Sequence, residues 1–234
     1  MIGILNEVVA WFTDPVNWQG VDGVPNRVWE HIQMTVFSVG IAALLSIPIA
    51  VVLAHKRVGG VVVVAIVNIG RAIPSFAIVA ISLPISIRLG LGLGFWPTFL
   101  ALLFLAVPPM FSNAYAGIAG VDPALVEAAQ GMGLTGRQVM TGIEFPVALP
   151  IVLAGARIAT VQVIATATLG ALVAWGGLGR YIIDGFSTQN MGEVFAGGLL
   201  VALLAVVSEL LFTMFERYAT PSGIHYEEPV GMAK

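Results

Sequence analysis

Five long apolar stretches, each bounded by charged or turn-forming residues, dominate the pattern of hydrophobic and polar positions. They run over residues 32–54, 58–83, 96–119, 146–175 and 193–215. A helix needs about 20 apolar residues to cross roughly 30 Å of hydrocarbon, and each stretch reaches that length. Because these runs are continuous instead of alternating, they favour helices over strands. The pattern predicts an all-α polytopic membrane protein with five transmembrane helices.

The residues that precede the first span predict a further, shorter helix. Apolar residues recur there at near-helical spacing, at Ile2, Leu5, Val9 and Phe12, with Trp11 and Trp18 nearby. This pattern is typical of an amphipathic helix that lies on a membrane surface, and a frayed terminus is the alternative. The expected organisation is an N-terminal interfacial segment (1–30), a transmembrane domain (31–218) and a cytoplasmic tail (219–234).

The composition excludes several classes of protein. Hydrophobic residues make up 58% of the 234 residues and charged residues 10%, whereas soluble domains carry about 25% charged residues. Disordered chains are poor in apolar residues, so disorder is excluded as well. The absence of cysteine removes thiolate metal sites and cysteine nucleophiles. The net charge of −3 offers no reason to expect nucleic-acid binding.

Basic residues in the loops predict the orientation of the chain. With the N-terminus outside, the cytoplasmic side collects Lys56, Arg57, Arg137, Arg217 and Lys234, and the outside collects Arg27, Arg88 and Arg180. Positive residues accumulate on the cytoplasmic side of membrane proteins. We therefore expect a cell-membrane protein whose N-terminus is outside and whose C-terminus is cytoplasmic.

The chain lacks the residue patterns of an enzyme. Neither of its lysines follows a glycine-rich loop, so there is no phosphate-binding P-loop. The histidines (His31, His55 and His225) are dispersed, and we interpret each as interfacial or solvated and not as a metal ligand. We expect no catalytic residue, no metal and no cofactor on this chain.

The loop between the third and fourth spans, residues 120–145, carries the most informative pattern. Asp122 can cap a helix that begins at Pro123 and stops at Gly131 or Gly133. Thr135 can cap a second short helix that we expect to end before Pro146. Two short helices placed between spans suit docking on a partner, and the alternative is a simple connection.

The spacing within this loop resembles the EAA loop of ABC importer permeases. It is carried by Glu127, Ala128, Ala129, Gly133, Ile143 and Pro146, with Phe145 where the family usually has leucine. The resemblance extends over residues 32–215. Further motifs at 71–75, 115–125, 165–168 and 176–179 look like the branch that transports quaternary-amine osmoprotectants. Methionine-type importers share the five-helix core and remain competitors.

The resemblance implies the type I permease fold and a division of labour between subunits. This chain would be the permease of an ATP-driven importer for glycine betaine, choline, carnitine or proline-type solutes. Its implied partners are a solute-binding protein, a second permease (identical or paralogous) and two ATP-binding subunits that hold ATP and magnesium. The implied ATPase-coupling residues are Asp122, Glu127, Ala128, Ala129, Gly133, Ile143 and Pro146. The alternatives are an importer of another small solute, such as an amino acid, and a secondary transporter.

Three charged residues lie inside the predicted spans. Arg71, Arg157 and Glu209 are placed at similar depths by helical geometry. Because charges are costly in hydrocarbon, we expect Glu209 to pair with Arg157 or Arg71, and contact with the solute is the alternative.

The fourth span also carries one face of small and polar residues. Its members are Gly155, Ala159, Gln162, Thr166 and Gly170. We expect this face to point towards a second permease and a translocation path, because small residues permit close helix approach. Packing within one subunit is the alternative.

Overall fold

The computed structural model describes residues 2–219, and every regular element in this part of the chain is helical. The α-helices are α1 (Ile2–Thr13), α2 (Val24–His55), α3 (Gly60–Ile69), α4 (Ser75–Arg88), α5 (Phe95–Ala119), α6 (Pro123–Gly131), α7 (Gly136–Val139), α8 (Phe145–Thr166), α9 (Gly179–Ser187) and α10 (Met191–Ala219). Shorter turns are η1 (Pro15–Trp18), η2 (Gly70–Ala72), the π turn η3 (Met140–Glu144) and η4 (Ala167–Val173). The predicted tail beyond Ala219, with His225 and Lys234, lies outside the described residues.

The five predicted spans correspond to four long apolar helical units and one bent pair. The long units within the described residues are α2, α5, residues 136–173 and α10, and each is long and apolar enough to cross a membrane. The fifth span is formed by residues 62–72 and α4, which meet at an angle of 77°. The all-α class and the number of spans are confirmed.

The expectation of one straight helix over residues 58–83 is wrong. Proline has no N–H group and disfavours the helical conformation of the residue before it. Accordingly, Ile73 adopts an extended conformation ahead of Pro74, and α4 begins only at Ser75. Arg71 therefore lies at a bend and is exposed, instead of lying within a straight span.

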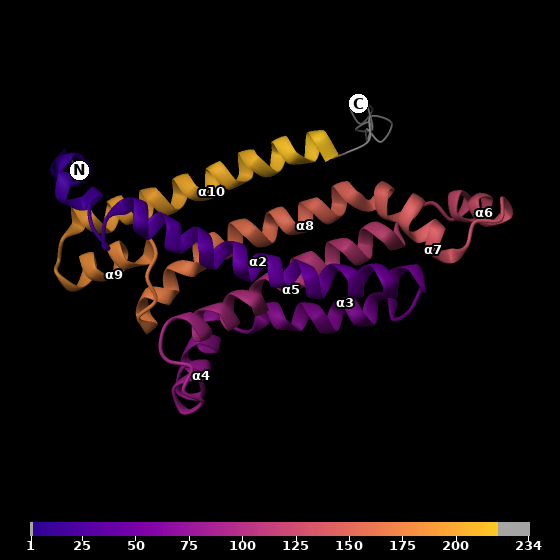
Figure 1. The fold of residues 1–234 in the computed structure, drawn as a ribbon, viewed down its shortest axis with the longest axis horizontal. Coiled ribbons are helices and arrows are strands. Elements are labelled where there is room, and N and C mark those ends of the chain that lie inside the picture. The colour runs from indigo at the N-terminus through magenta and orange to yellow at the C-terminus, as the bar shows by residue number, and fades with distance from the viewer. Residues whose placement is uncertain (1, 220–234) are drawn as a thin grey trace, which may run out of the picture.

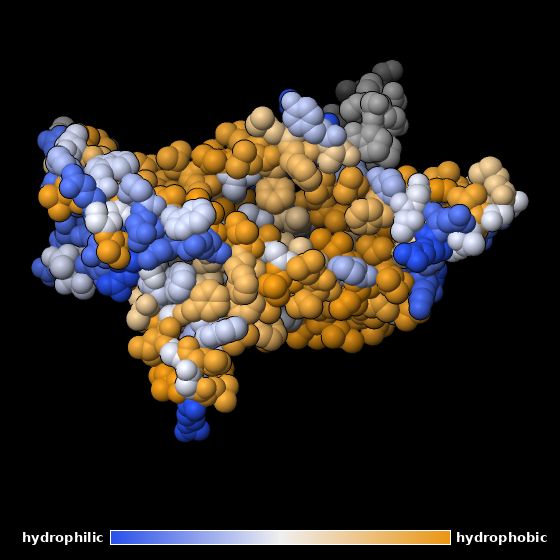
Figure 2. Space-filling model, in the orientation of Figure 1, coloured by the Kyte–Doolittle hydropathy of each residue, from blue (hydrophilic) through white to orange (hydrophobic). Residues whose placement is uncertain are grey.

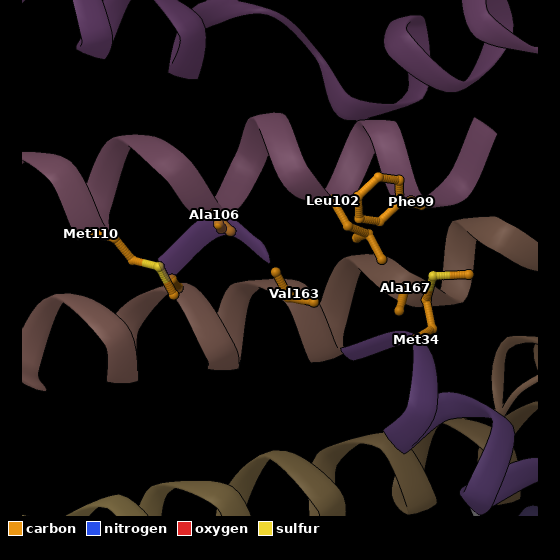
Figure 3. Packing of buried hydrophobic residues seen from close by; sticks show 9 residues of the cluster. Met34, Phe99, Leu102, Ala106, Met110, Val163 and Ala167 are labelled. Carbon is orange, nitrogen blue, oxygen red and sulfur yellow. The ribbon is translucent and has the colours of Figure 1, made fainter. Parts of the chain in front are cut away.

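Helix α5 forms the centre of the bundle and packs against both α2 and α8, which run beside it (Figure 1). Over half of its most apolar 18-residue window is buried (56%), against 17% for α10 at the edge. Figure 3 shows the contact layer, in which Phe99, Leu102 and Met110 of α5 meet Val163 of α8 and Met34 of α2. This packing aligns α2, α5 and α8 along one long axis.

The two ends of this bundle differ in content, and we name them for what they hold. The loop end holds α6 and α7, and the N-terminal end holds α1, α9 and the start of α2 (Figure 1). Hydrophilic side chains gather at both ends, and apolar side chains cover the middle (Figure 2). This distribution fits a chain that crosses a bilayer between its two ends.

The predicted N-terminal helix is present as α1. Trp11 is buried, and its ring lies 5.0 Å from that of Tyr181 in α9 in an edge-to-face arrangement. One turn earlier in α1, Glu7 lies against Gly192 at the start of α10. The following helix, α2, already begins at Val24, inside the segment expected to precede the transmembrane domain. That α1 lies on a membrane surface stays a prediction.

Candidate functional site

Helix α6 opens the 120–145 loop as its residues predict. Asp122 Oδ1 accepts a hydrogen bond of 2.9 Å from the backbone N–H of Ala124, and Pro123 occupies the first turn. A proline suits this position because the first N–H groups of a helix have no partner within the helix. The predicted cap is confirmed, and it fixes where the chain turns away from α5.

The end of α6 is set by a glycine in the left-handed region. Gly133 has a φ of +87°, and the N–H of Leu134 donates to Ala129 O over 3.2 Å. This is the usual way in which a glycine ends a helix, because other residues resist a positive φ. A methyl group at Gly133 would touch nothing, so the requirement there is conformational and not spatial.

The EAA residues lie on two faces of α6. Ala129 is buried, whereas Glu127 and Ala128 are exposed. Two large apolar side chains are exposed beside them, Leu125 at 43% and Met132 at 74%. The loop therefore presents small, apolar and acidic groups together on a surface that projects beyond the helical bundle (Figure 1).

The second short helix, α7, begins as predicted and ends differently. Thr135 and Gln138 form a reciprocal capping box at its start. The expected end before Pro146 is wrong, because the helix passes through the π turn directly into α8. A proline is tolerated there since it occupies the first turn of α8. Ile143 and Pro146 are half-buried at this junction.

Both ends of the loop are held by the turn that joins α2 to α3. His55 Nδ1 donates to Glu144 Oε2 over 2.5 Å at the end of the loop. At its beginning, Arg57 Nη1 donates to Ala119 O over 3.0 Å. Glu144 is 1% exposed and His55 is half-buried, so His55 is not a freely solvated residue, and a place for it at the membrane interface stays a prediction.

The sequence did not predict these contacts, because no local pattern of residues indicates them. His55 and Glu144 are 89 positions apart. The only available signal was an acidic residue between Ile143 and Phe145, at a position where α8 begins its apolar run.

The predicted ion pair between the fourth and fifth spans is present. Arg157 Nε lies 3.5 Å from Glu209 Oε1, and Arg157 Nη1 lies 3.6 Å from Glu216 Oε2. Glu216 was not anticipated. All three side chains are partly exposed, so this cluster links α8 to α10 without being enclosed by the chain.

The small face of α8 packs mostly within the chain. A methyl group on Gly155 would lie 2.7 Å from Asn113 Cβ in α5, and Ala159 is fully buried. Gly170, which lies beyond α8 in η4, is packed against Thr98 in the same way. Packing within one subunit, the alternative reading, therefore accounts for these three residues, because α5 already occupies their side of the helix.

Gln162 and Thr166 differ from the three residues above. Both are half-buried, and Gln162 Oε1 has no hydrogen-bond partner among the described residues. A place for these two on a translocation path stays a prediction.

At the N-terminal end, α2 holds the segment that follows η4. The N–H of Gly177 donates to Glu30 Oε2 over 2.7 Å. The N–H of Leu178 donates to His31 Nδ1 over 3.3 Å, and His31 Nε2 donates to Ile164 O over 2.9 Å. His31 is 1% exposed, so it is a core residue and not an interfacial one.

Tyr181 completes this network. Its hydroxyl donates to Asp22 O over 2.6 Å. Burial raises the pKa of Tyr181 to about 12, so the hydroxyl keeps the proton it donates.

The fourth predicted span is shorter than expected as a regular helix. The α-helix α8 ends at Thr166 and continues as the 3-10 helix η4, and the chain then turns at Ala174, whose φ is +66°.

Comparison with known proteins places this architecture in a family. Residues 46–220 match the family described as binding-protein-dependent transport system inner membrane component. The chain belongs to this family. It is accordingly a multi-pass, non-catalytic permease subunit of an ABC transporter, and its family implies separate ATPase and binding-protein partners.

Individual relatives agree over most of their length. The choline transport system permease protein OpuBB of Bacillus subtilis is 35% identical over 198 residues, which cover 85% of this chain and 89% of the relative. The osmoprotectant import permease protein OsmW of Salmonella typhimurium is 29% identical, over 84% of this chain and 91% of the relative.

A solved structure confirms the fold. The chain resembles a subunit in the inward-facing structure of the MetNI methionine ABC transporter, with a TM-score of 0.74 and 24% identity. The match covers 89% of this chain and all of that subunit. At this level of identity the likeness concerns the fold and not the transported solute.

Proposed function

We propose that this chain imports quaternary-amine osmoprotectants, of the glycine betaine, choline, carnitine and proline type, together with an ATPase on the cytoplasmic side. The observation that carries the solute class is the similarity to permeases named for choline, carnitine and glycine betaine, at 31–35% identity over 85% of the chain. Another small solute, such as an amino acid, is the alternative that a transport assay must exclude.

The geometry of the 120–145 loop supports the coupling role. Leu125 and Met132 are exposed at a hydrophilic end of the molecule, where an uncovered apolar group gains nothing from lipid. Beside them Glu127 and Ala128 are exposed and Ala128 is small enough for close approach. We assign this surface to contact with the ATPase, with Asp122 and Gly133 setting the ends of α6.

The proposed assembly contains two permease subunits, identical or paralogous, two ATP-binding subunits and one extracytoplasmic binding protein. In it the loop end is cytoplasmic and the N-terminal end faces the binding protein. A bilayer covers the apolar middle, and Gln162 and Thr166 contribute to the path between the permeases. ATP and magnesium are held by the ATPase.

Transport by the reconstituted assembly tests the solute. The complex in proteoliposomes, with binding protein outside and Mg-ATP inside, is expected to accumulate labelled choline or glycine betaine and not methionine. Import of methionine without any quaternary amine would contradict the proposal. Flux without ATP would indicate a secondary transporter.

The absence of native cysteine gives a direct test of orientation. Single variants Leu91→Cys before the start of α5 and Met132→Cys after its end place exposed thiols beyond opposite ends of this span. A membrane-impermeant maleimide added outside intact cells is expected to label Leu91→Cys alone. Labelling of Met132→Cys instead would reverse the assignment.

A further inference from the structure

The end of α2 and the turn that follows it contact the 120–145 loop at both of its ends. His55 bonds to Glu144, the residue before α8 begins, and Arg57 bonds to Ala119, the last residue of α5. The chain itself connects α6 and α7 to α5 and α8, and these two contacts connect them to α2 and the turn before α3. We name His55, Arg57, Ala119 and Glu144 the loop bracket.

Burial makes the His55–Glu144 hydrogen bond the stronger part of the loop bracket. A hydrogen bond to a carboxylate is roughly twice as strong as one between neutral groups, and Glu144 is almost completely buried. Removing its partner would leave a buried carboxylate oxygen unsatisfied, which is costly. The pair therefore resists separation when the loop is pushed or pulled.

The backbone around Glu144 is also unusual. Residues 140–144 form a π turn, an arrangement that is rare and frequent at functional sites. Such a turn holds an extra residue and so changes the face on which the following side chains lie. On the facing side, a methyl group on Gly136 would lie 3.3 Å from His55 Nε2, so the imidazole ring also rests against the start of α7.

Arg57 provides an independent observation at the other end of the loop. Its φ is +54°, a conformation that a residue other than glycine adopts reluctantly. Arg57 ends α2 in this conformation, and its side chain reaches Ala119 O. Tyr115 reinforces the junction, because its hydroxyl donates to Val58 O over 3.0 Å. A glycine in place of Arg57 would ease the turn and lose the contact.

We propose that the loop bracket transmits movement of the 120–145 loop to α2 and α3, with His55 as a positioning residue that acts through Glu144. The proposal rests on the coupling role given to this loop above. In an ATP-driven permease, the bracket would make the loop and the α2–α3 turn move as one body. Without it, ATP hydrolysis would continue while α2 and α3 fail to follow the loop.

The test uses the complete reconstituted complex and compares His55→Ala with His55→Asn. Asparagine can keep an N–H group near the position of Nδ1, so it is expected to preserve coupling, whereas alanine cannot. For His55→Ala we expect an ATPase content equal to that of the parent complex and about tenfold less solute transported per ATP hydrolysed, within the usual range of coupling effects. Thr141→Ala is the matched control, because Thr141 lies in the same π turn and bonds only to Arg137 O of its own segment.

Three outcomes would overturn the proposal. One is an unchanged transport-to-ATP ratio in His55→Ala, and another is a failure of asparagine to differ from alanine. The third is loss of the ATPase from the purified His55→Ala complex, which would reduce the contact to a requirement for assembly. Glu144→Gln, which keeps the size and one acceptor oxygen, is expected to lie between the parent and His55→Ala.

A distance measurement separates this proposal from the choice of solute. Spin labels at Met132→Cys and Lys56→Cys report the separation of α6 from the α2–α3 turn, and both native residues are exposed. We expect the distance to stay the same between nucleotide-free and vanadate-trapped states, and to shift in His55→Ala. If the complex transports no quaternary amine but the distances behave as expected, the proposed solute class is wrong and the proposal for the loop bracket is still supported. A distance that shifts equally in the parent and in His55→Ala would overturn the loop bracket.

Discussion

The two ends of the bundle are both organised by α2, and they are built differently. At the N-terminal end, Glu30 and His31 bond to backbone atoms of the segment that follows η4, and glycines there are closely packed. At the loop end, α6 and α7 project from the bundle, with exposed apolar side chains. The N-terminal end is a network of hydrogen bonds and close contacts. The loop end projects from the bundle and is held where the loop begins and where it ends.

The difference indicates which end is built to move. The segment around Gly177 is joined to α2 by two adjacent backbone N–H groups, so it can shift only if both hydrogen bonds break together. A segment with few buried contacts opens at low free-energy cost. We therefore expect the loop end to rearrange when the ATPase works, while the segment around Gly177 keeps its place on α2.

Crowding the N-terminal end should have the largest effect on stability. A methyl group on Gly179 would lie 2.3 Å from the backbone oxygen of Thr168, so Gly179→Ala forces the backbone to move. We expect a loss of about 3 kcal/mol, seen as a fall of roughly 6–12 °C in the thermal unfolding midpoint. Gly198→Ala is the control, because a methyl group there touches nothing. Equal unfolding midpoints for Gly179→Ala and Gly198→Ala would contradict the close packing that distinguishes the N-terminal end from the loop end.

Removing one bond of the N-terminal network should have an intermediate effect. Glu30→Ala leaves the N–H of Gly177 without its acceptor and takes a carboxylate from Arg27. Hydrogen bonds to charged groups contribute about 1.5–3 kcal/mol, and the partial exposure of Glu30 favours the lower value. Hydrogen exchange of the Gly177 amide should accelerate, with less change in Glu30→Gln, which keeps an acceptor oxygen. Unchanged exchange in Glu30→Ala would show that this segment is not held by α2.

A change at the loop end should have the smallest effect on overall stability. Gly133→Ala imposes a positive φ on a residue with a side chain, at a cost of about 1 kcal/mol. We expect faster hydrogen exchange in α6 and an almost unchanged unfolding midpoint. Asparagine at this position should be tolerated better than alanine. Gly131→Ala is the control, since Gly131 has no positive φ and open space around it. A large fall in the midpoint would mean that the loop is part of the rigid bundle.

Several features of the candidate site were predictable because their causes are local. The cap at Asp122 involves an N–H two residues away, and the turn at Gly133 depends on one φ angle. The bend at Pro74 also has a local cause, but it was missed because the run over residues 58–83 is predominantly apolar, with Arg71 as its single charge. Apolar length alone does not distinguish one straight helix from two that meet at an angle.

The contacts between distant helices were not predictable in the same way. Arg157 had two candidate partners in the sequence, and the structure pairs it with Glu209 and adds Glu216. The row of small residues at 155–170 was compatible with contact to a second permease or with packing inside the chain. In the structure α5 packs against Gly155, Ala159 and Gly170. The rotation of each helix about its axis decides such contacts, and many apolar faces are compatible with more than one rotation.

The sequence by itself determined the class of protein, the number of apolar spans and the turn chemistry of the 120–145 loop. Hydrophobic length and backbone conformation act over neighbouring residues, so they can be read along the chain. Only the tertiary structure decided that His31 is a core residue and that His55 holds Glu144. Those roles arise when helices far apart in sequence pack together and bury polar groups, which must then find partners across the interface.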